Sequence, residues 1–331
     1  MATADQVKAL LSSLAEGDEA HFYSVAMQIA AAEARMGHGK FAEELRSLID
    51  KVKERSALPS RQPIPLARPR GEVAELLVVT YPNVHLADMV LSATVRHKLE
   101  RTIREHKAVR AIRGQGLPPR RKLLLVGKPG TGKTLTASAM ATELGLPLFV
   151  VRLDALITKF MGETAAKLRL IFEALSQTRG VYLFDEFDSI GSARGLANDV
   201  GEIRRIVNSF LQMVEQDNSD SLIIAATNHV SILDRALFRR FDDVIEYSLP
   251  TPTQIVDTFK TKLASFKTDK IVWSRLAEAS KGLSFADITR ACEDAIKDAI
   301  VHAYPAITSA SLTSAVRERK DALKLRRGRT V

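Results

Sequence analysis

Short apolar runs alternate with amphipathic helical patterns through the middle of the chain. The runs begin at residues 123 (LLLVG), 148 (LFVVRLD), 181 (VYLFDEFD), 222 (LIIAATN) and 244 (VIEYSL). Nearly continuous apolar runs are typical of strands covered on both faces, and their alternation with helices is typical of a parallel sheet. We therefore predict an α/β domain over residues 72–251.

Helical periodicity replaces the strand signals on both sides of this domain. In residues 1–57, apolar positions recur at spacings of three and four in three short segments, which predicts an antiparallel three-helix bundle. Residues 58–71 hold four prolines, which remove amide donors and favour extended backbone, so we expect a linker there. Four further helical patterns predict an all-helical domain over residues 252–331: 253–266, 270–281, 285–303 and 308–325.

A glycine-rich turn follows the first apolar run. Residues 127–134 read GKPGTGKT, between the strand LLLV and the helical segment TLTASAMATEL. Glycines in such a turn let backbone amides and a helix N-terminus face phosphate oxygens where no Cβ fits. Lys133 is expected to neutralise the β and γ phosphates of ATP, and the Thr134 hydroxyl to bind Mg²⁺. The predicted nucleotide-binding residues here are Gly127, Lys128, Pro129, Gly130, Thr131, Gly132, Lys133, Thr134 and Leu135.

Polar residues end two of the other predicted strands. Asp185 and Glu186 follow VYLF at the carboxyl end of its strand, where parallel sheets bind ligands. We expect Asp185 to bind the nucleotide's Mg²⁺ through water and Glu186 to act as general base on the attacking water. Asn228 ends LIIAATN and is expected to order the same water. An acidic strand end and a turn-forming asparagine are the structural alternatives.

Five motifs in order resemble those of the AAA family of ATPases across residues 86–300: GKPGTGKT, KFMGET, FDEFDSI, AATN and ALFRRFD. The resemblance implies a hexameric ring, an α/β domain with sheet order 5-1-4-3-2, and a helical lid over the nucleotide in which Ala286 contacts it. The arginine doublet is most similar to the severing and disassembly branch of the family. A short chain with a helical N-terminal domain is similar to small bacterial members.

The resemblance also implies residues that act between subunits. Arg239 and Arg240 are expected to reach the γ-phosphate bound by a neighbouring subunit, where a guanidinium accelerates hydrolysis by about a thousand-fold or more. Hydrolysis would then depend on assembly. Asp188 is expected to face the adjoining subunit. The alternatives are a pair of surface arginines and a helix-capping aspartate.

A second implied element is a loop that lines the central pore of substrate-threading members. Phe160, Met161 and Gly162 match its aromatic, hydrophobic and glycine positions, and Lys159 and Glu163 flank them as in the family. A large side chain next to glycine can grip a peptide without recognising its sequence. Buried core residues are the alternative for Phe and Met.

Two positions depart from the family pattern. Phe285, in GLSFADI, stands where a glycine normally passes close to the adenine. Upstream, LADMVLS has Leu91 or Ser92 where a glycine often follows. We therefore expect adenine to be recognised through altered packing.

Composition sets the class of protein but not its activity. The 331-residue chain is 46% hydrophobic and 26% charged, as in ordinary globular proteins. Its single cysteine, Cys292, allows neither an internal disulfide nor a cysteine-based zinc site. No apolar run is long enough to span a membrane and the first residues lack a secretory pattern, so we expect a cytoplasmic protein without membrane insertion.

The net charge of +9 is concentrated in two segments. Residues 96–122 hold ten Lys or Arg against two Glu, and residues 317–329 hold seven against one Glu and one Asp, which gives local charges of +8 and +5. Solvated helical faces and a nucleic-acid surface are both compatible with such segments. The absence of interleaved aromatic residues favours solvated faces.

Three functions are compatible with these features. The first is ATP-driven protein remodelling by a ring, expected to be a homohexamer, with the N-terminal bundle recruiting the client. The second is nucleotide-dependent control of a partner protein such as a protease. The third is a nucleic-acid motor or loader that uses the two basic segments. The resemblance favours the first.

Overall fold

The computed structural model describes residues 25–27, 29–30, 41–43, 47, 71–156, 161–187, 200–228 and 238–327. The chain divides into two compact units, Met1–Pro65 and Leu66–Val331. The predicted bundle of residues 1–57 and the predicted linker of 58–71 lie mostly outside the described residues, and the predicted domain boundaries remain predictions. In the first unit, the described residues Val25, Ala26, Ile29 and Ala30 are helical and buried.

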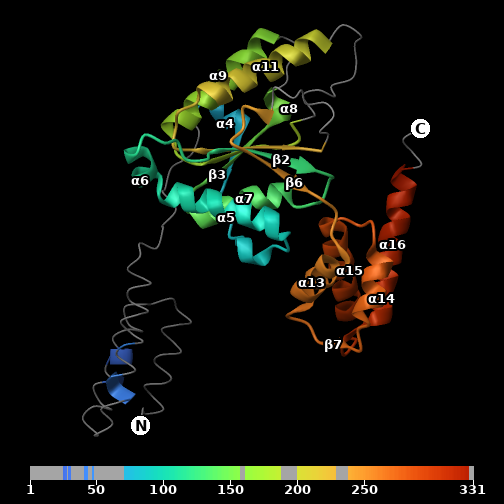
Figure 1. The fold of residues 1–331 in the computed structure, drawn as a ribbon. Coiled ribbons are helices and arrows are strands. Elements are labelled where there is room, and N and C mark those ends of the chain that lie inside the picture. Colours follow the sequence, from blue (N-terminus) through green and yellow to red (C-terminus); the bar gives the residue numbers. More distant parts are fainter. Residues whose placement is uncertain are drawn as a thin grey trace. The chain divides into compact units, whose positions relative to one another are not determined.

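One six-stranded sheet forms the centre of the second unit (Figure 1), in the order β1-β3-β4-β5-β2-β6. Its strands are β1 Leu77–Thr80, β2 Lys122–Gly127, β3 Leu148–Val151, β4 Val181–Phe184, β5 Leu222–Thr227 and β6 Asp243–Tyr247. The five strands predicted from the apolar runs are parallel to one another. Numbered along the chain as a set of five, they follow the predicted order 5-1-4-3-2, which confirms the fold class.

The edge strand β1 was not predicted from the sequence. It pairs antiparallel with β3, from Leu77 opposite Val151 to Thr80 opposite Leu148. Only Leu77 of its four residues is buried, because an edge strand is covered less than a central one. The continuous apolar signal of the other strands is therefore weak here.

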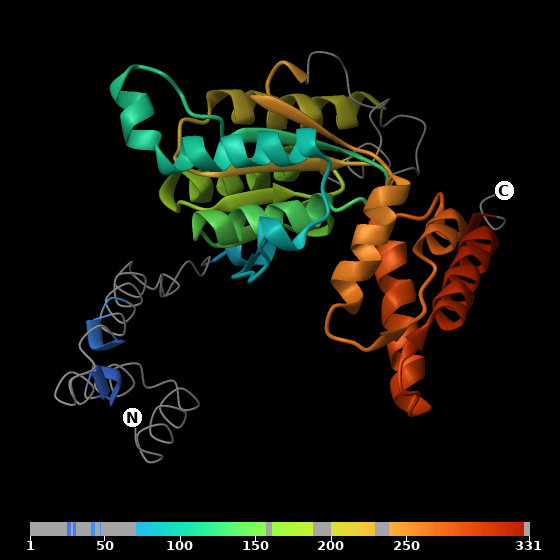
Figure 2. The ribbon, with the colours of Figure 1, turned by 60° about the horizontal axis from the view of Figure 1, so that its bottom comes forward.

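Helices cover both faces of the sheet (Figures 1 and 2). On one face α5 (Ala93–Lys107) and α7 (Lys133–Leu144) pack against alternate strand residues such as Leu123 and Leu125. On the other face α9 (Met161–Gln177) and α11 (Val200–Gln216) pack against Leu124 and Val126. Because both faces of β2 are buried, its sequence is apolar at every position from 123 to 126. Short helical segments complete this region: α4 Val73–Leu76, η1 Leu86–Asp88, α6 Val109–Gly114 and α8 Leu153–Leu156.

A helical region with its own core follows β6 (Figure 2). Its helices are α13 Pro252–Leu263, α14 Trp273–Ser280, α15 Phe285–Val301 and α16 Ser309–Arg327. The prediction that this region is all-helical was wrong. Two short strands, β7 (Thr268–Asp269) and β8 (Ile307–Thr308), pair parallel within it. Two-residue strands are too short to leave a period in the sequence.

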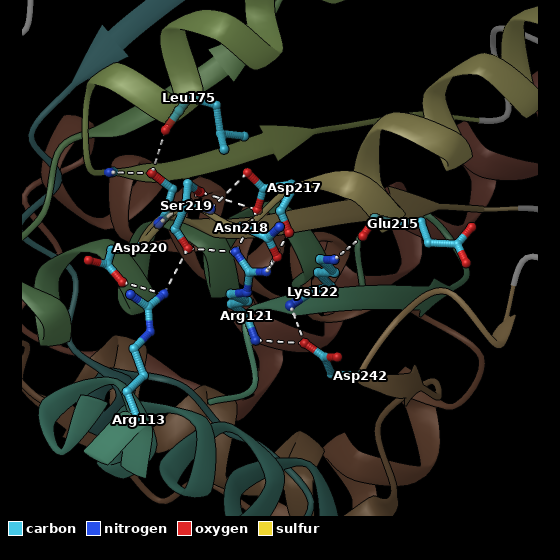
Figure 3. Close-up of polar contacts among 12 residues, drawn as sticks. Arg113, Arg121, Lys122, Leu175, Glu215, Asp217, Asn218, Ser219, Asp220 and Asp242 are labelled. Carbon is cyan, nitrogen blue, oxygen red and sulfur yellow. Dashed lines mark hydrogen bonds and ion pairs between the residues drawn. The ribbon is translucent and has the colours of Figure 1, made fainter. Parts of the chain in front are cut away.

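A polar cluster joins the amino ends of β2 and β6 to the segment after α11 (Figure 3). The Arg121 guanidinium donates to the Asp217 carboxylate at 2.7 Å and to the carbonyl of Ser219 at 2.5 Å. The backbone N–H groups of Arg121 and Lys122 both donate to the Asp242 carboxylate, at 2.8 and 2.9 Å. Arg121 and Asp217 are buried, so the contacts compensate the charges that folding removes from water.

Candidate active site

The glycine-rich turn joins the end of β2 to the start of α7. Gly127 ends β2, and a Cβ there would lie 2.3 Å from the backbone oxygen of Tyr247 in the adjacent strand. Gly130 and Gly132 have φ angles of +75° and +105°, which side chains disfavour. Gly132 is also the N-cap of α7, so the turn leads directly to a helix N-terminus. This geometry suits a bound phosphate chain.

Lys133 is held inside the turn that precedes it. Its Nζ donates to the backbone oxygens of Gly127 at 2.7 Å and Lys128 at 3.1 Å, and to Oδ1 of Asn228 at 2.8 Å. Asn228 directly follows β5, the neighbour of β2 in the sheet. The structure thus brings together two predicted site residues that lie 95 positions apart in the chain.

Thr134, in the first turn of α7, forms a hydrogen bond with Asp185, which directly follows β4. The Thr134 hydroxyl donates to Oδ2 of Asp185 at 2.5 Å, and Oδ1 of Asp185 accepts the backbone N–H of Glu186 at 2.9 Å. A hydroxyl and a carboxylate oxygen are the hard donors that Mg²⁺ prefers, and Mg²⁺ commonly takes its remaining ligands from water and substrate phosphates. Within the described residues no group of three or more His, Cys, Asp or Glu forms a separate metal site. The residues present therefore fit a nucleotide-bound magnesium ion.

Glu186 has an unusual backbone conformation. Its φ angle is +51°, in the left-handed region that is costly for a residue other than glycine. The next residue, Phe187, is 1% exposed, and its backbone N–H donates to the oxygen of Ala226 in β5 at 2.9 Å. Anchoring Phe187 in the core keeps Glu186 in the strained turn after β4. Glu186 lines the same cavity as Asp185, Asn228 and Lys133.

A cavity of about 520 Å³ lies between the turn and the helical region. The backbone N–H of Ala286, in the first turn of α15, donates to the oxygen of Gly130 at 3.1 Å. Phe285 lines the cavity, and so does Leu91, one of the two residues given for the upstream departure from the family pattern. A nucleoside in this cavity would therefore meet a phenyl ring and a branched aliphatic side chain.

Several cavity residues were not predicted from the sequence. Two helices of the lid contribute six polar residues to the lining: Thr258, Thr261 and Lys262 of α13, and Thr289, Arg290 and Glu293 of α15. Their spacing of three or four places each set on one face of its helix. On α15 this face continues from Ala286, so the helical period was the signal that could have identified them.

Arg239 and Arg240 lie away from this cavity. They precede β6, whose first residue, Asp243, is paired with Leu123 near the start of β2, whereas Tyr247 is paired with Gly127 at the cavity end. Asp243 and Tyr247 are four residues apart, which corresponds to about 13 Å along β6. Arg239 is exposed, and Nε of Arg240 lies 3.5 Å from the Glu215 carboxylate of α11. The arginines are therefore at the opposite end of the sheet from the glycine-rich turn of their own chain.

Other predicted site residues lie outside the described part of the chain. They are Lys159, Phe160 and Asp188. Met161 and Gly162 begin α9, and Glu163 lies in its first turn. The assignments of the pore loop and of the intersubunit aspartate therefore remain predictions.

Acidic residues from other segments neutralise part of the charge of the basic segment 96–122. Five of its ten basic side chains form ion pairs: Lys98 and Arg101 with Asp243, Arg113 with Asp220, Arg120 with Glu105, and Arg121 with Asp217. Three of these acids lie outside the segment, which lowers its local charge from +8 to +5. The Arg113–Asp220 and Arg121–Asp217 contacts are seen in Figure 3. This pairing disfavours a nucleic-acid surface here.

Among the described residues, no helix is both long and apolar enough to span a membrane.

Sequence comparison supplies independent evidence on the family. The model of the ATPase family associated with various cellular activities (AAA) matches residues 123–249. An uncharacterized AAA family ATPase, y4kL, of Sinorhizobium fredii is 36% identical over 303 residues, which cover 91% of this chain and 90% of that protein. A proteasome-activating nucleotidase of Sulfurisphaera tokodaii is 34% identical over 256 residues, 73% of this chain and 64% of that protein. Protein SAV of Sulfolobus acidocaldarius is 38% identical over 203 residues, 59% of this chain and 25% of that protein.

Proposed function

This chain belongs to the AAA family of ATPases, and we propose that it assembles into a ring that uses ATP hydrolysis to unfold or disassemble protein clients. The observation that carries the proposal is the arrangement of Lys133, Asn228, Thr134 and Asp185 around one glycine-rich turn. These contacts join the glycine-rich turn to the carboxyl ends of β4 and β5, where the proposed hydrolytic residues Glu186 and Asn228 lie.

This geometry supports the proposed catalytic roles. Lys133 neutralises phosphate charge. Thr134 and Asp185 would hold Mg²⁺, and the bound ion would supply stabilisation of the charge on the phosphate oxygens. Glu186 accepts a proton from the attacking water, and Asn228 orders that water. The left-handed turn at Glu186 supports its role, because strained backbone is concentrated at functional sites.

The position of the arginine doublet supports action between subunits. Arg239 and Arg240 are attached to the end of β6 that lies opposite the glycine-rich turn of their own chain. In the proposed ring their guanidinium groups act on a phosphate held by another subunit. In this proposal a single subunit binds ATP but hydrolyses it slowly.

Two alternative functions are weighed against protein remodelling. Relatives named proteasome-activating nucleotidase favour the related possibility that the ring controls a partner protease. Co-purification of a protease, with peptide hydrolysis that rises on addition of the ring and ATP, would support it. The ion pairs of segment 96–122 make a nucleic-acid motor the weaker alternative.

The test of remodelling separates ATP hydrolysis from work on a client. A folded fluorescent protein carrying an unstructured peptide is mixed with the assembled ring and ATP, and loss of fluorescence is followed beside phosphate release. We expect Phe160→Ala to retain hydrolysis and lose unfolding, whereas Phe266→Ala, an exposed phenylalanine after α13, retains both. Unchanged unfolding by Phe160→Ala would exclude threading through this loop.

A further inference from the structure

An ion pair connects α16 to α15, the helix whose first turns line the cavity. Nε of Arg319, in α16, donates to Oδ1 of Asp287, in α15, at 3.0 Å. The two side chains are only 18% and 16% exposed. A pair this shielded from water is screened less by salt than a surface pair, and its loss leaves a partly buried carboxylate without its cation.

Asp287 also organises the N-terminus of α15. Its Oδ2 accepts the Ser284 hydroxyl at 2.6 Å and the Ser284 backbone N–H at 3.3 Å, and its own N–H donates to Ser284 Oγ at 3.2 Å. This reciprocal capping box fixes the first turn of the helix. Burial alone would raise the pKa of Asp287, but the hydrogen bonds from Ser284 and Arg319 lower it, so the carboxylate stays ionised.

The same first turn touches the phosphate-binding loop. Ala286 N–H donates to the oxygen of Gly130 at 3.1 Å. A Cβ at Gly130 would lie 2.4 Å from Ser284 Oγ and 3.1 Å from the Cβ of Ala286. Gly130 and the cap are therefore in such close contact that a displacement of one moves the other.

We propose that Arg319 is a positioning residue for nucleotide binding. By pairing with Asp287 it holds the capping box of α15, and the capping box sets the position of Phe285 and Ala286 next to Gly130. Arg319 lies in α16 and contributes no atom to the cavity lining. Arg319 affects the position of the first turn of α15, and this position affects how tightly the cavity closes on a nucleotide. The inference rests on the proposed phosphate site at the glycine-rich turn.

The described part of α16 offers a matched control on the same helix. Arg317 is exposed and forms no ion pair among the described residues, so Arg317→Gln removes the same charge without changing the cap. Asp287→Asn provides a second route, because its amide oxygen can still accept from Ser284 while its NH₂ group cannot pair with Arg319. Arg319→Lys restores the charge but not the directed Nε–H contact.

The experiment measures ADP affinity by titration calorimetry, the KM and kcat for ATP, and the unfolding temperature without nucleotide. We expect Arg319→Gln to weaken ADP binding and raise KM by about 5-fold, at the low end of typical coupling between sites. Arg319→Lys should recover part of the loss, and Arg317→Gln should match the parent protein. Asp287→Asn should weaken binding similarly, and adding Arg319→Gln to it should have little further effect.

Two results would overturn the inference. One is an ADP affinity of Arg319→Gln equal to that of Arg317→Gln. The other is a lower unfolding temperature without nucleotide and unchanged affinity, which would mean that Arg319 stabilises the helical region alone. Lys133→Ala is the separate control for the phosphate site: retained ADP binding in that variant contradicts the proposed function itself, whatever Arg319 does.

Discussion

Replacing Gly130 by alanine tests the contact between the glycine-rich turn and the start of α15. Gly130 has a φ angle of +75°, and a Cβ there would lie 2.4 Å from Ser284 Oγ and 3.0 Å from Ser284 Cβ. Gly116 is a matched control, because its φ angle is also +75° but a Cβ would meet nothing within 4 Å. The two substitutions therefore share the backbone strain and differ in the steric clash.

The size of the effect follows from these two terms. A left-handed φ costs an alanine roughly 1–2 kcal/mol, so the free energy of unfolding of both variants falls by this amount. In Gly130→Ala the Ser284 side chain must also leave its capping position, and overpacking with loss of a cap costs about 1–3 kcal/mol more. For a unit of this size each kcal/mol lowers the unfolding temperature by about 2–4 °C. ADP binding should be strongly weakened by Gly130→Ala and unchanged by Gly116→Ala.

The assay is thermal and urea unfolding of both variants without nucleotide, followed by ADP titration. Unfolding without nucleotide isolates the contact with the lid from any effect of the new methyl group on phosphate. Equal free energies of unfolding for the two variants would refute the close contact between Gly130 and Ser284. Parent-like ADP affinity in Gly130→Ala would contradict the placement of phosphate at this turn.

Three further predictions concern catalysis, assembly and pH. Lys133→Ala should abolish ATP binding, whereas Glu186→Gln should retain binding and slow phosphate release by about 10²–10⁴-fold, as measured by filter binding and a phosphate assay. A variant with Arg239 and Arg240 changed to alanine should bind ATP without hydrolysing it. Mixing this variant with the Glu186→Gln protein should restore hydrolysis, because some sites then combine an intact Glu186 with intact arginines from a neighbour. No recovery of hydrolysis in mixed rings would contradict the action of the arginines between subunits. Burial and a neighbouring arginine lower the pKa of His106 from 6.5 to about 4, so the unfolded chain binds the extra proton between these values. The free energy of unfolding should therefore fall by about 3 kcal/mol as pH drops from 6.5 to 4, and urea titrations of His106→Gln should lack this part of the pH dependence.

The parallel strands were predictable because burial on both faces imposes a local pattern. Every residue of β4 and β5 is buried, so their apolar runs stand out from the helices around them. The pattern failed where burial is one-sided or the element is very short, as in β1 and β7. Tertiary pairing produces these strands, and nothing in their own few residues requires it.

The basic segment 96–122 shows the same limit for electrostatics. Its charge can be counted from the sequence, but the chain position of a lysine does not tell which carboxylate will face it. Asp243 lies more than a hundred residues from Lys98 and Arg101, yet it accepts from both, at 2.7 and 3.2 Å. Packing of α5 against β6 therefore decides how much of the segment's charge is left for a partner.

By itself the sequence determined the glycine-rich turn, because the conformation of this turn depends on the backbone preferences of a few consecutive residues. Only the tertiary structure decided that Asn228 meets Lys133 and that Arg319 holds Asp287. Each of these contacts joins residues far apart in the chain, so its geometry depends on how strands and helices pack. Local steric preferences can be recognised in a short segment, whereas a contact between distant side chains exists only once the core has brought their backbones together.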